Sequence, residues 1–159
     1  MKRMSSAVAA LVAVIAFSTA VCAESSSLKA ARTLVAQEQM GRNLPSLALL
    51  AGKNTTTYAM IAEKLGNARA NSALSEEINA LLPRYQPKWD ENLAAAYEQS
   101  FSEQELSSLV AEGRASKYVA TVRERQAEIG HYMQASAAPV LTALVTDALK
   151  ATVDKSMNQ

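Results

Sequence analysis

The sequence predicts an all-α fold, a compact bundle of about six or seven short helices with no sheet. From Leu28 onward, apolar residues recur three and four positions apart, which is the spacing of one helix face. No segment alternates apolar and polar residues between hairpin turns, as a half-buried strand does. The chain has five glycines and is only 5% aromatic, and its abundant alanine and leucine are strong helix formers.

Three helices are expected in the first half of the chain. The first begins near Leu28 and ends at Met40-Gly41. The second is NLPSLALLAGKN, in which a proline near the start and a glycine near the end mark the two ends of a helix. Asn54, with Thr55 to Thr57, is expected to cap the third, whose apolar stripe runs from Tyr58 to Leu65. The same asparagine begins a glycosylation sequon, which is the alternative interpretation of this turn.

A break at LGNARANS precedes the next apolar stripe, which runs from Leu74 to Tyr85. Pro83 and Pro87 interrupt this stripe, because each proline removes a backbone donor and restricts the residue before it. We therefore expect Pro87 to lie in the first turn of a new helix. On that helix Trp89 is followed by Leu93 and Tyr97 at intervals of four residues, and Trp89 is expected to anchor the core.

The C-terminal part is expected to hold three more helices. One starts at Ser102 and ends at a loose point near Gly113. A longer one carries a single apolar stripe from Tyr118 to Met133. Pro139 opens the last helix, because proline is favoured in the first turn. Residues 156–159 are expected to form a frayed tail.

Residues 1–23 have the layout of a secretory signal peptide. Lys2 and Arg3 precede an apolar stretch over residues 7–17, and small residues follow before an expected cut between Ala23 and Glu24. The apolar stretch is about half the roughly 20 residues that a membrane-spanning helix needs. No stable membrane insertion is therefore expected after cleavage, and residues 24–159 are expected to form a single helical domain. An uncleaved anchor, or lipidation of Cys22, is the alternative.

A signal peptide places the chain in the periplasm, or otherwise makes it secreted or signal-anchored. Cleavage leaves 136 residues with 14 basic and 15 acidic side chains, a formal net charge of −1. This near-neutral balance argues against a nucleic acid as partner, which needs a basic face. It argues equally against polybasic membrane docking. Cleavage also removes the only cysteine, which excludes a disulfide or a cysteine nucleophile.

The stretch YEQSFSEQELSSLV contains the clearest local signal. Ser102 and Glu105 have the spacing of a capping box, in which each side chain accepts a hydrogen bond from the backbone N–H of the other. Phe101 and Leu106 have the spacing of the hydrophobic staple that accompanies such a cap. The alternative, a hydrolase using Glu98 with Glu103 or Glu105 as acid and base, requires two carboxyls to converge in a cleft. The cap already uses Glu105, so no catalytic residue is expected.

Other candidate sites are weaker. The lone His131 is expected to be a structural or surface residue, and one histidine without cysteine excludes a multi-histidine metal site. No Ca²⁺-binding loop or phosphate-binding loop occurs, so no cofactor is expected, although an all-carboxylate metal site stays open. The mixed charges from Arg114 to Arg125 are expected to form a solvated helix face or part of a protein-binding surface. Met40, Met60 and Met133 are either core residues or the adaptable wall of an apolar groove.

The segments AAAYEQSFSEQELSSLVAEG and AAPVLTAL resemble the domain of unknown function family numbered 2059, small helical domains of exported bacterial proteins. The resemblance covers residues 74–149 and is best at Tyr97, Phe101, Ser102, Glu105 and Leu106. The family's aromatic pair and Ser-Pro-x-Gly turn are missing, since the corresponding region here reads AEGRASKYV. The resemblance implies an all-helical fold and a periplasmic location, and it implies no activity.

These observations favour an exported helical domain that is not an enzyme and that binds another protein or an envelope component. The alternative is a periplasmic carrier or sensor of a small apolar ligand, which the methionine-bearing stripes motivate. A carboxylate-based hydrolase is the third hypothesis. The sequence identifies neither the partner nor the oligomeric state.

Overall fold

The computed structural model describes residues 25–157, and every regular element in that range is a helix, which confirms the all-α prediction. The expected cut between Ala23 and Glu24 lies outside the described residues. Within them, no helix is both long enough and apolar enough to cross a membrane. The elements are α1 Ser26–Gln37, η1 Met40–Asn43, α2 Leu44–Lys53, α3 Thr56–Leu65, α4 Asn67–Ser100, α5 Glu103–Glu112, η2 Gly113–Ala115, α6 Val119–Glu124, α7 Gln126–Ser136 and α8 Ala138–Met157, where η marks a 3-10 helix.

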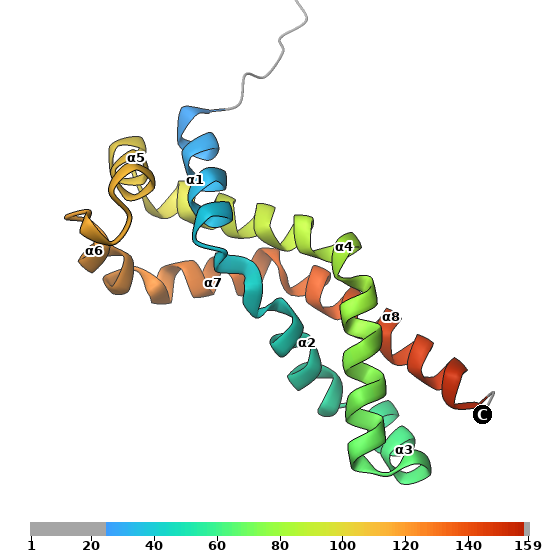
Figure 1. Ribbon diagram of the computed structural model, residues 1–159. Coiled ribbons are helices and arrows are strands. Elements are labelled where there is room, and N and C mark those ends of the chain that lie inside the picture. Colours follow the sequence, from blue (N-terminus) through green and yellow to red (C-terminus); the bar gives the residue numbers. More distant parts are fainter. Residues whose placement is uncertain (1–24, 158–159) are drawn as a thin grey trace, which may run out of the picture.

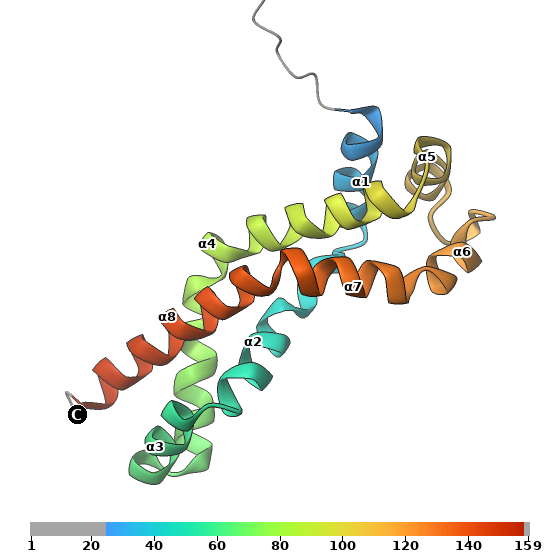
Figure 2. The same cartoon turned by 180° about the vertical axis from the view of Figure 1, so that it is seen from behind.

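The long helix α4 is the spine of the molecule. Figure 1 shows it bent near its middle, so that its first half lies beside α3 and its second half passes α1 toward α5. Seen from behind in Figure 2, α7 and α8 run one after the other across α4. Helices α5 and α6 lie at one end of this crossing and α3 at the other. Helices α1, α2, α3, α7 and α8 therefore pack against α4, whereas α5 packs mainly against α1, and α6 against α7 and η2.

The helix start expected at Pro87 is wrong, because Pro83 and Pro87 both lie inside α4. A proline inside a helix removes one backbone hydrogen bond, and its ring pushes against the preceding turn. The two prolines are exposed and four residues apart, so they lie on the same face. Sharp bends in helices occur at such positions, and here the distortion bends α4 without ending it. Packing against both α1 and α8 holds the two halves in place.

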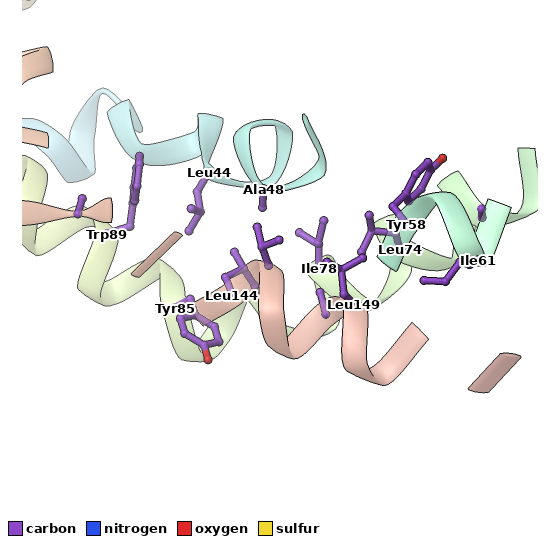
Figure 3. Packing of buried hydrophobic residues seen from close by; sticks show 14 residues of the cluster. Leu44, Ala48, Tyr58, Ile61, Leu74, Ile78, Tyr85, Trp89, Leu144 and Leu149 are labelled. Atoms are coloured by element: carbon purple, nitrogen blue, oxygen red, sulfur yellow. The ribbon is translucent and has the colours of Figure 1, made fainter. Parts of the chain in front are cut away.

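Buried apolar side chains form two clusters along α4. The larger cluster joins α2, α3, α8 and the part of α4 up to Trp89. Figure 3 shows it as a row of side chains from Trp89 at one end to Tyr58 and Ile61 at the other. Trp89 is 6% exposed, as expected of a core anchor. The buried members of the larger cluster are Leu44, Ala48, Tyr58, Ile61, Ala70, Leu74, Ile78, Tyr85, Trp89, Ala137, Leu144, Val145, Ala148 and Leu149.

The smaller cluster joins α1, α5, α7 and the second half of α4. Trp89 belongs to the larger cluster and Leu93, one turn later, to the smaller one, so α4 carries the core from one to the other. Met133 packs against both clusters. The buried members of the smaller cluster are Ala31, Leu34, Val35, Leu93, Ala94, Ala96, Tyr97, Phe101, Leu106, Leu109 and Ile129.

The structure defines three expected boundaries more closely. The break at LGNARANS is the single residue Gly66, whose φ of 80° belongs to the left-handed region that favours glycine. Within the cap expected at residues 54–57, Thr55 is the residue that caps α3, because its hydroxyl accepts a hydrogen bond from the N–H of Tyr58 at 3.1 Å. The long helix expected after Gly113 is two helices, α6 and α7, which meet at Arg125.

The frayed tail expected at residues 156–159 is wrong for Ser156, which is buried inside α8. Lys64 donates a hydrogen bond to the Ser156 carbonyl and thereby supplies a donor to the end of the helix. One residue earlier, Lys155 pairs with the buried carboxylate of Glu77. These contacts join the end of α8 to α3 and α4 and keep its last turn ordered. Residues 158–159 lie outside the described range.

Candidate binding site

The residues expected to cap α5 form a capping box. Ser102 Oγ accepts from the N–H of Glu105 at 3.3 Å, and Glu105 Oε2 accepts from the N–H of Ser102 at 2.8 Å. Phe101, before the cap, and Leu106, after it, are both buried in the smaller cluster. The box therefore starts α5, and its flanking apolar residues fix that helix to the core.

Arg125 reinforces this cap from the junction of α6 and α7. Its guanidinium lies 3.2 Å from Glu105 Oε2, donates to the carbonyl of Ser100 and sits 4.8 Å above the ring of Phe101. The hydrogen bond from the Ser102 backbone lowers the pKa of Glu105, burial opposes this effect, and Arg125 adds to it. A lowered pKa keeps the carboxylate ionised, which suits a cap and not a proton donor.

The three glutamates of the hydrolase hypothesis have separate surroundings. Glu98 accepts a hydrogen bond from Ser25, the N-cap of α1, and so joins α4 to the start of the described chain. Glu105 belongs to the capping box, and Glu103 is exposed in the first turn of α5. None of the three lines the groove beside Trp89 or the groove between α1, α5 and α6. The arrangement is that of three structural carboxylates.

The first of two grooves, here called the tryptophan groove, lies where the two clusters meet. It has a volume of about 450 Å³ and runs between η1, α4, α7 and the start of α8. The stack of Trp89, Leu93 and Tyr97 expected from the sequence forms the α4 side. Every lining residue is uncharged. They are Met40, Asn43, Leu47, Trp89, Leu93, Tyr97, Gln126, Ile129, Gly130, Met133, Gln134, Ala138 and Leu141.

Two polar groups stand out in the wall of the tryptophan groove. The indole Nε1 of Trp89 is buried and has no hydrogen-bond acceptor among the described residues. Tyr97 stacks on Phe101 with ring centroids 5.4 Å apart. Burial raises the pKa of Tyr97, while a hydrogen bond with Gln126 lowers it in part. The groove thus combines a large apolar wall with a few neutral hydrogen-bonding groups.

The second groove, here called the arginine groove, lies between α1, α5 and α6. Its volume is about 210 Å³. Leu34, Leu109 and Val122 contribute to an apolar floor, which Met40 and Val119 complete. Glu38, Arg114 and Arg123 are exposed and form its charged rim. Gly113, with a φ of 54°, makes the turn that brings the rim arginine of η2 to this position.

Some residues that line the two grooves were predicted from the sequence. Met40 lines both grooves and Met133 lines one, whereas Met60 lies on α3 with 67% of its surface exposed and lines neither. His131 is exposed. The arginine groove was missed because its floor combines α1 with α5 and α6, which are remote in sequence. The mixed charges between Arg114 and Arg125 were its only signal.

Within residues 25–157, no group of three histidine, aspartate or glutamate side chains is placed to hold a metal ion. No protein-family model, curated protein or solved structure matches this chain. The resemblance of residues 74–149 to family 2059 stays a prediction. The region where the family's turn is missing contributes Gly113, Arg114 and Val119 to the wall of the arginine groove.

Proposed function

We propose that this chain is an exported helical domain of the cell envelope that acts without catalysis, by binding another protein through the arginine groove. The signal peptide expected at residues 1–23 supports the location. The observation that carries the proposal is the composition of the groove, an apolar floor with two arginines on its rim.

Three properties of the groove favour a protein as its occupant. An apolar centre with a polar rim is the usual anatomy of a protein–protein interface, and arginine is enriched there. Sites for small molecules have volumes of about 300–1,000 Å³. The arginine groove, at about 210 Å³, is smaller and suits one or two side chains of a partner. Such an anchor in a desolvated pocket often supplies much of the binding energy.

The rim also indicates the partner's charge. Arg114 and Arg123 face a single acid, Glu38, so the rim is net positive. A partner with an apolar anchor flanked by aspartate or glutamate would match both the floor and the rim. Rim charges act mainly on the rate of association and on specificity, so the arginines are expected to select the partner and the floor to hold it.

Site-specific photo-crosslinking in the native host tests the proposal. A photoreactive amino acid replaces Val119 in the full-length chain, and a matched control places it at His131, which is exposed on α7. We expect one discrete protein adduct from position 119 and none from position 131. In the Arg114→Glu/Arg123→Glu variant the adduct should disappear, because the reversed rim repels an acidic partner.

Both arginines are exposed, so the charge-reversed variant is expected to keep its helical circular dichroism spectrum. Equal adducts from the two positions, or an adduct that survives charge reversal, would contradict the proposal.

A further inference from the structure

We propose that the tryptophan groove binds a neutral, largely apolar small molecule that carries a hydrogen-bond acceptor. This activity is independent of the protein-binding proposal, because it uses a different groove. Only Met40 lines both.

The size of the groove favours a small molecule. Its volume of about 450 Å³ lies inside the range of about 300–1,000 Å³ found for ligand sites. The groove lies between helices of a bundle, where such sites commonly occur. Gly130 lies in the lining of the groove, and a Cβ built at this residue meets no atom within 4 Å, so a larger side chain can be introduced there without a clash at its Cβ.

The lack of charged residues in the wall favours a neutral ligand. Moving an ionised group from water into an apolar site is costly unless an opposite charge pairs with it. No lysine, arginine, aspartate or glutamate lines the tryptophan groove. An anionic or cationic ligand would therefore lose its hydration and gain no counter-charge, whereas a neutral ligand loses little.

The indole N–H of Trp89 favours a ligand that carries a hydrogen-bond acceptor. A buried N–H without an acceptor costs free energy, and buried donors in folded proteins are nearly always paired. An acceptor on the ligand would remove that cost. Nε1 is buried, so an acceptor on the ligand reaches it only if a side chain of the wall moves. Met40 and Met133 in the wall are unbranched and rearrange at low cost.

Three ten-carbon probes test the inference on the purified protein. 2-Decanone is neutral with one acceptor, decanoate is charged, and decane has no acceptor. Trp89 is the only tryptophan in the chain, so its fluorescence reports binding directly. We expect 2-decanone to change the emission saturably. Decanoate should bind at least about tenfold more weakly, because the wall offers it no counter-charge.

Two substitutions at one residue provide the matched control. Gly130→Leu places a large side chain at the edge of the groove, where a Cβ meets nothing, and should abolish binding of 2-decanone. Gly130→Ala adds only a methyl group at the same position and should retain it. Both replacements improve the helix propensity of α7, so neither is expected to unfold the protein.

Trp89→Phe keeps an aromatic ring but removes the donor. Native mass spectrometry of this variant should show affinity for 2-decanone about two- to tenfold lower, the worth of one net hydrogen bond, while decane should bind the variant and the natural chain equally. The inference is overturned if decanoate binds as tightly as 2-decanone, or if Gly130→Leu leaves the fluorescence titration unchanged. Neither result bears on the crosslink at the arginine groove.

Discussion

The two clusters along α4 are closed in different ways. The smaller cluster is closed partly by neighbours in sequence, since Ser102 pairs with Glu105 and Tyr97 stacks on Phe101. Longer-range contacts of Glu98 with Ser25 and of Glu91 with Arg32 add to these. In the larger cluster the polar contacts at the edge join residues that are far apart in sequence. Lys155 pairs with Glu77, and the hydroxyl of Tyr85 donates to Asp147 at 2.6 Å.

The two proposed binding grooves also lie differently relative to the clusters, since the tryptophan groove borders both clusters and the arginine groove only the smaller one. Both grooves border the smaller cluster, where short helices α5, α6 and α7 meet at turns. The larger cluster is formed around the longest elements, α4 and α8. Short elements held by local caps can present irregular surfaces, whereas long packed helices give a continuous core.

Removing a fully buried leucine from either cluster should have the largest effect. Leu144 in the larger cluster and Leu106 in the smaller one are both 0% exposed. Each change to alanine should lower the free energy of unfolding by about 2–5 kcal/mol, since it leaves a cavity. Because α4 passes through both clusters, Trp89 fluorescence and far-ultraviolet circular dichroism should give coincident urea transitions. Separate transitions in either variant would show that the two clusters unfold independently.

The cap of α5 should have the next largest effect and should give the smaller cluster a distinct acid sensitivity. Ser102→Ala should cost about 1 kcal/mol, the usual worth of an N-cap. The folded-state pKa of Glu105 is lowered, so its stabilisation is present above the unfolded-state pKa near 4.5 and is lost as the pH falls through the folded-state value. Glu105→Gln should therefore flatten the decline in stability below about pH 5, measured by urea unfolding. An unchanged decline would contradict this role for Glu105.

The larger cluster should lose stability at high pH. The hydrogen bond from Tyr85 to Asp147 raises the pKa of Tyr85, and burial adds to the increase. Its stabilisation is complete below the unfolded-state pKa near 10 and is lost as the pH rises through the folded-state value. Tyr85→Phe should cost about 0.5–1.5 kcal/mol at pH 7. In thermal melts this variant should also lose less stability than the natural chain above pH 10. Equal losses in the variant and the natural chain would contradict this role for Tyr85.

The smallest effect is expected at the exposed pair of Arg32 and Glu91, which joins α1 to α4 beside the smaller cluster. The guanidinium of Arg32 lowers the pKa of Glu91 by hydrogen bonding to it. The two side chains are 43% and 48% exposed, so Glu91→Gln should cost no more than about 1 kcal/mol. That cost should shrink further in 1 M salt. A larger, salt-independent loss would mean that Glu91 has a role beyond this ion pair.

What the sequence could predict depended on how far apart the interacting residues lie. The box of Ser102 and Glu105 was found because its partners are three residues apart. The order of the last turn of α8 was missed because the partners of Ser156 and Lys155 lie 92 and 78 residues away. The continuity of α4 through Pro87 was missed for the same reason, because packing against α1 and α8, not local propensity, holds the bent helix.

The candidate sites follow the same pattern. The stripe of Trp89, Leu93 and Tyr97 was recognised as buried, but a linear pattern does not show that one side of it is left open. That space depends on the position of α7 relative to α4, because both helices contribute lining residues. The floor of the arginine groove likewise requires α1 and α6 to face each other.

The most direct test of binding in the tryptophan groove is a methyl nuclear magnetic resonance spectrum of the protein with labelled leucine, valine and methionine, recorded with and without 2-decanone. Signals from Leu93, Met133 and Leu141 should shift saturably, because these residues line the tryptophan groove. Signals from Leu74 and Val145, in the larger cluster, should stay in place. Shifts centred on Leu74 and Val145, or the absence of any saturable shift, would contradict binding in the tryptophan groove.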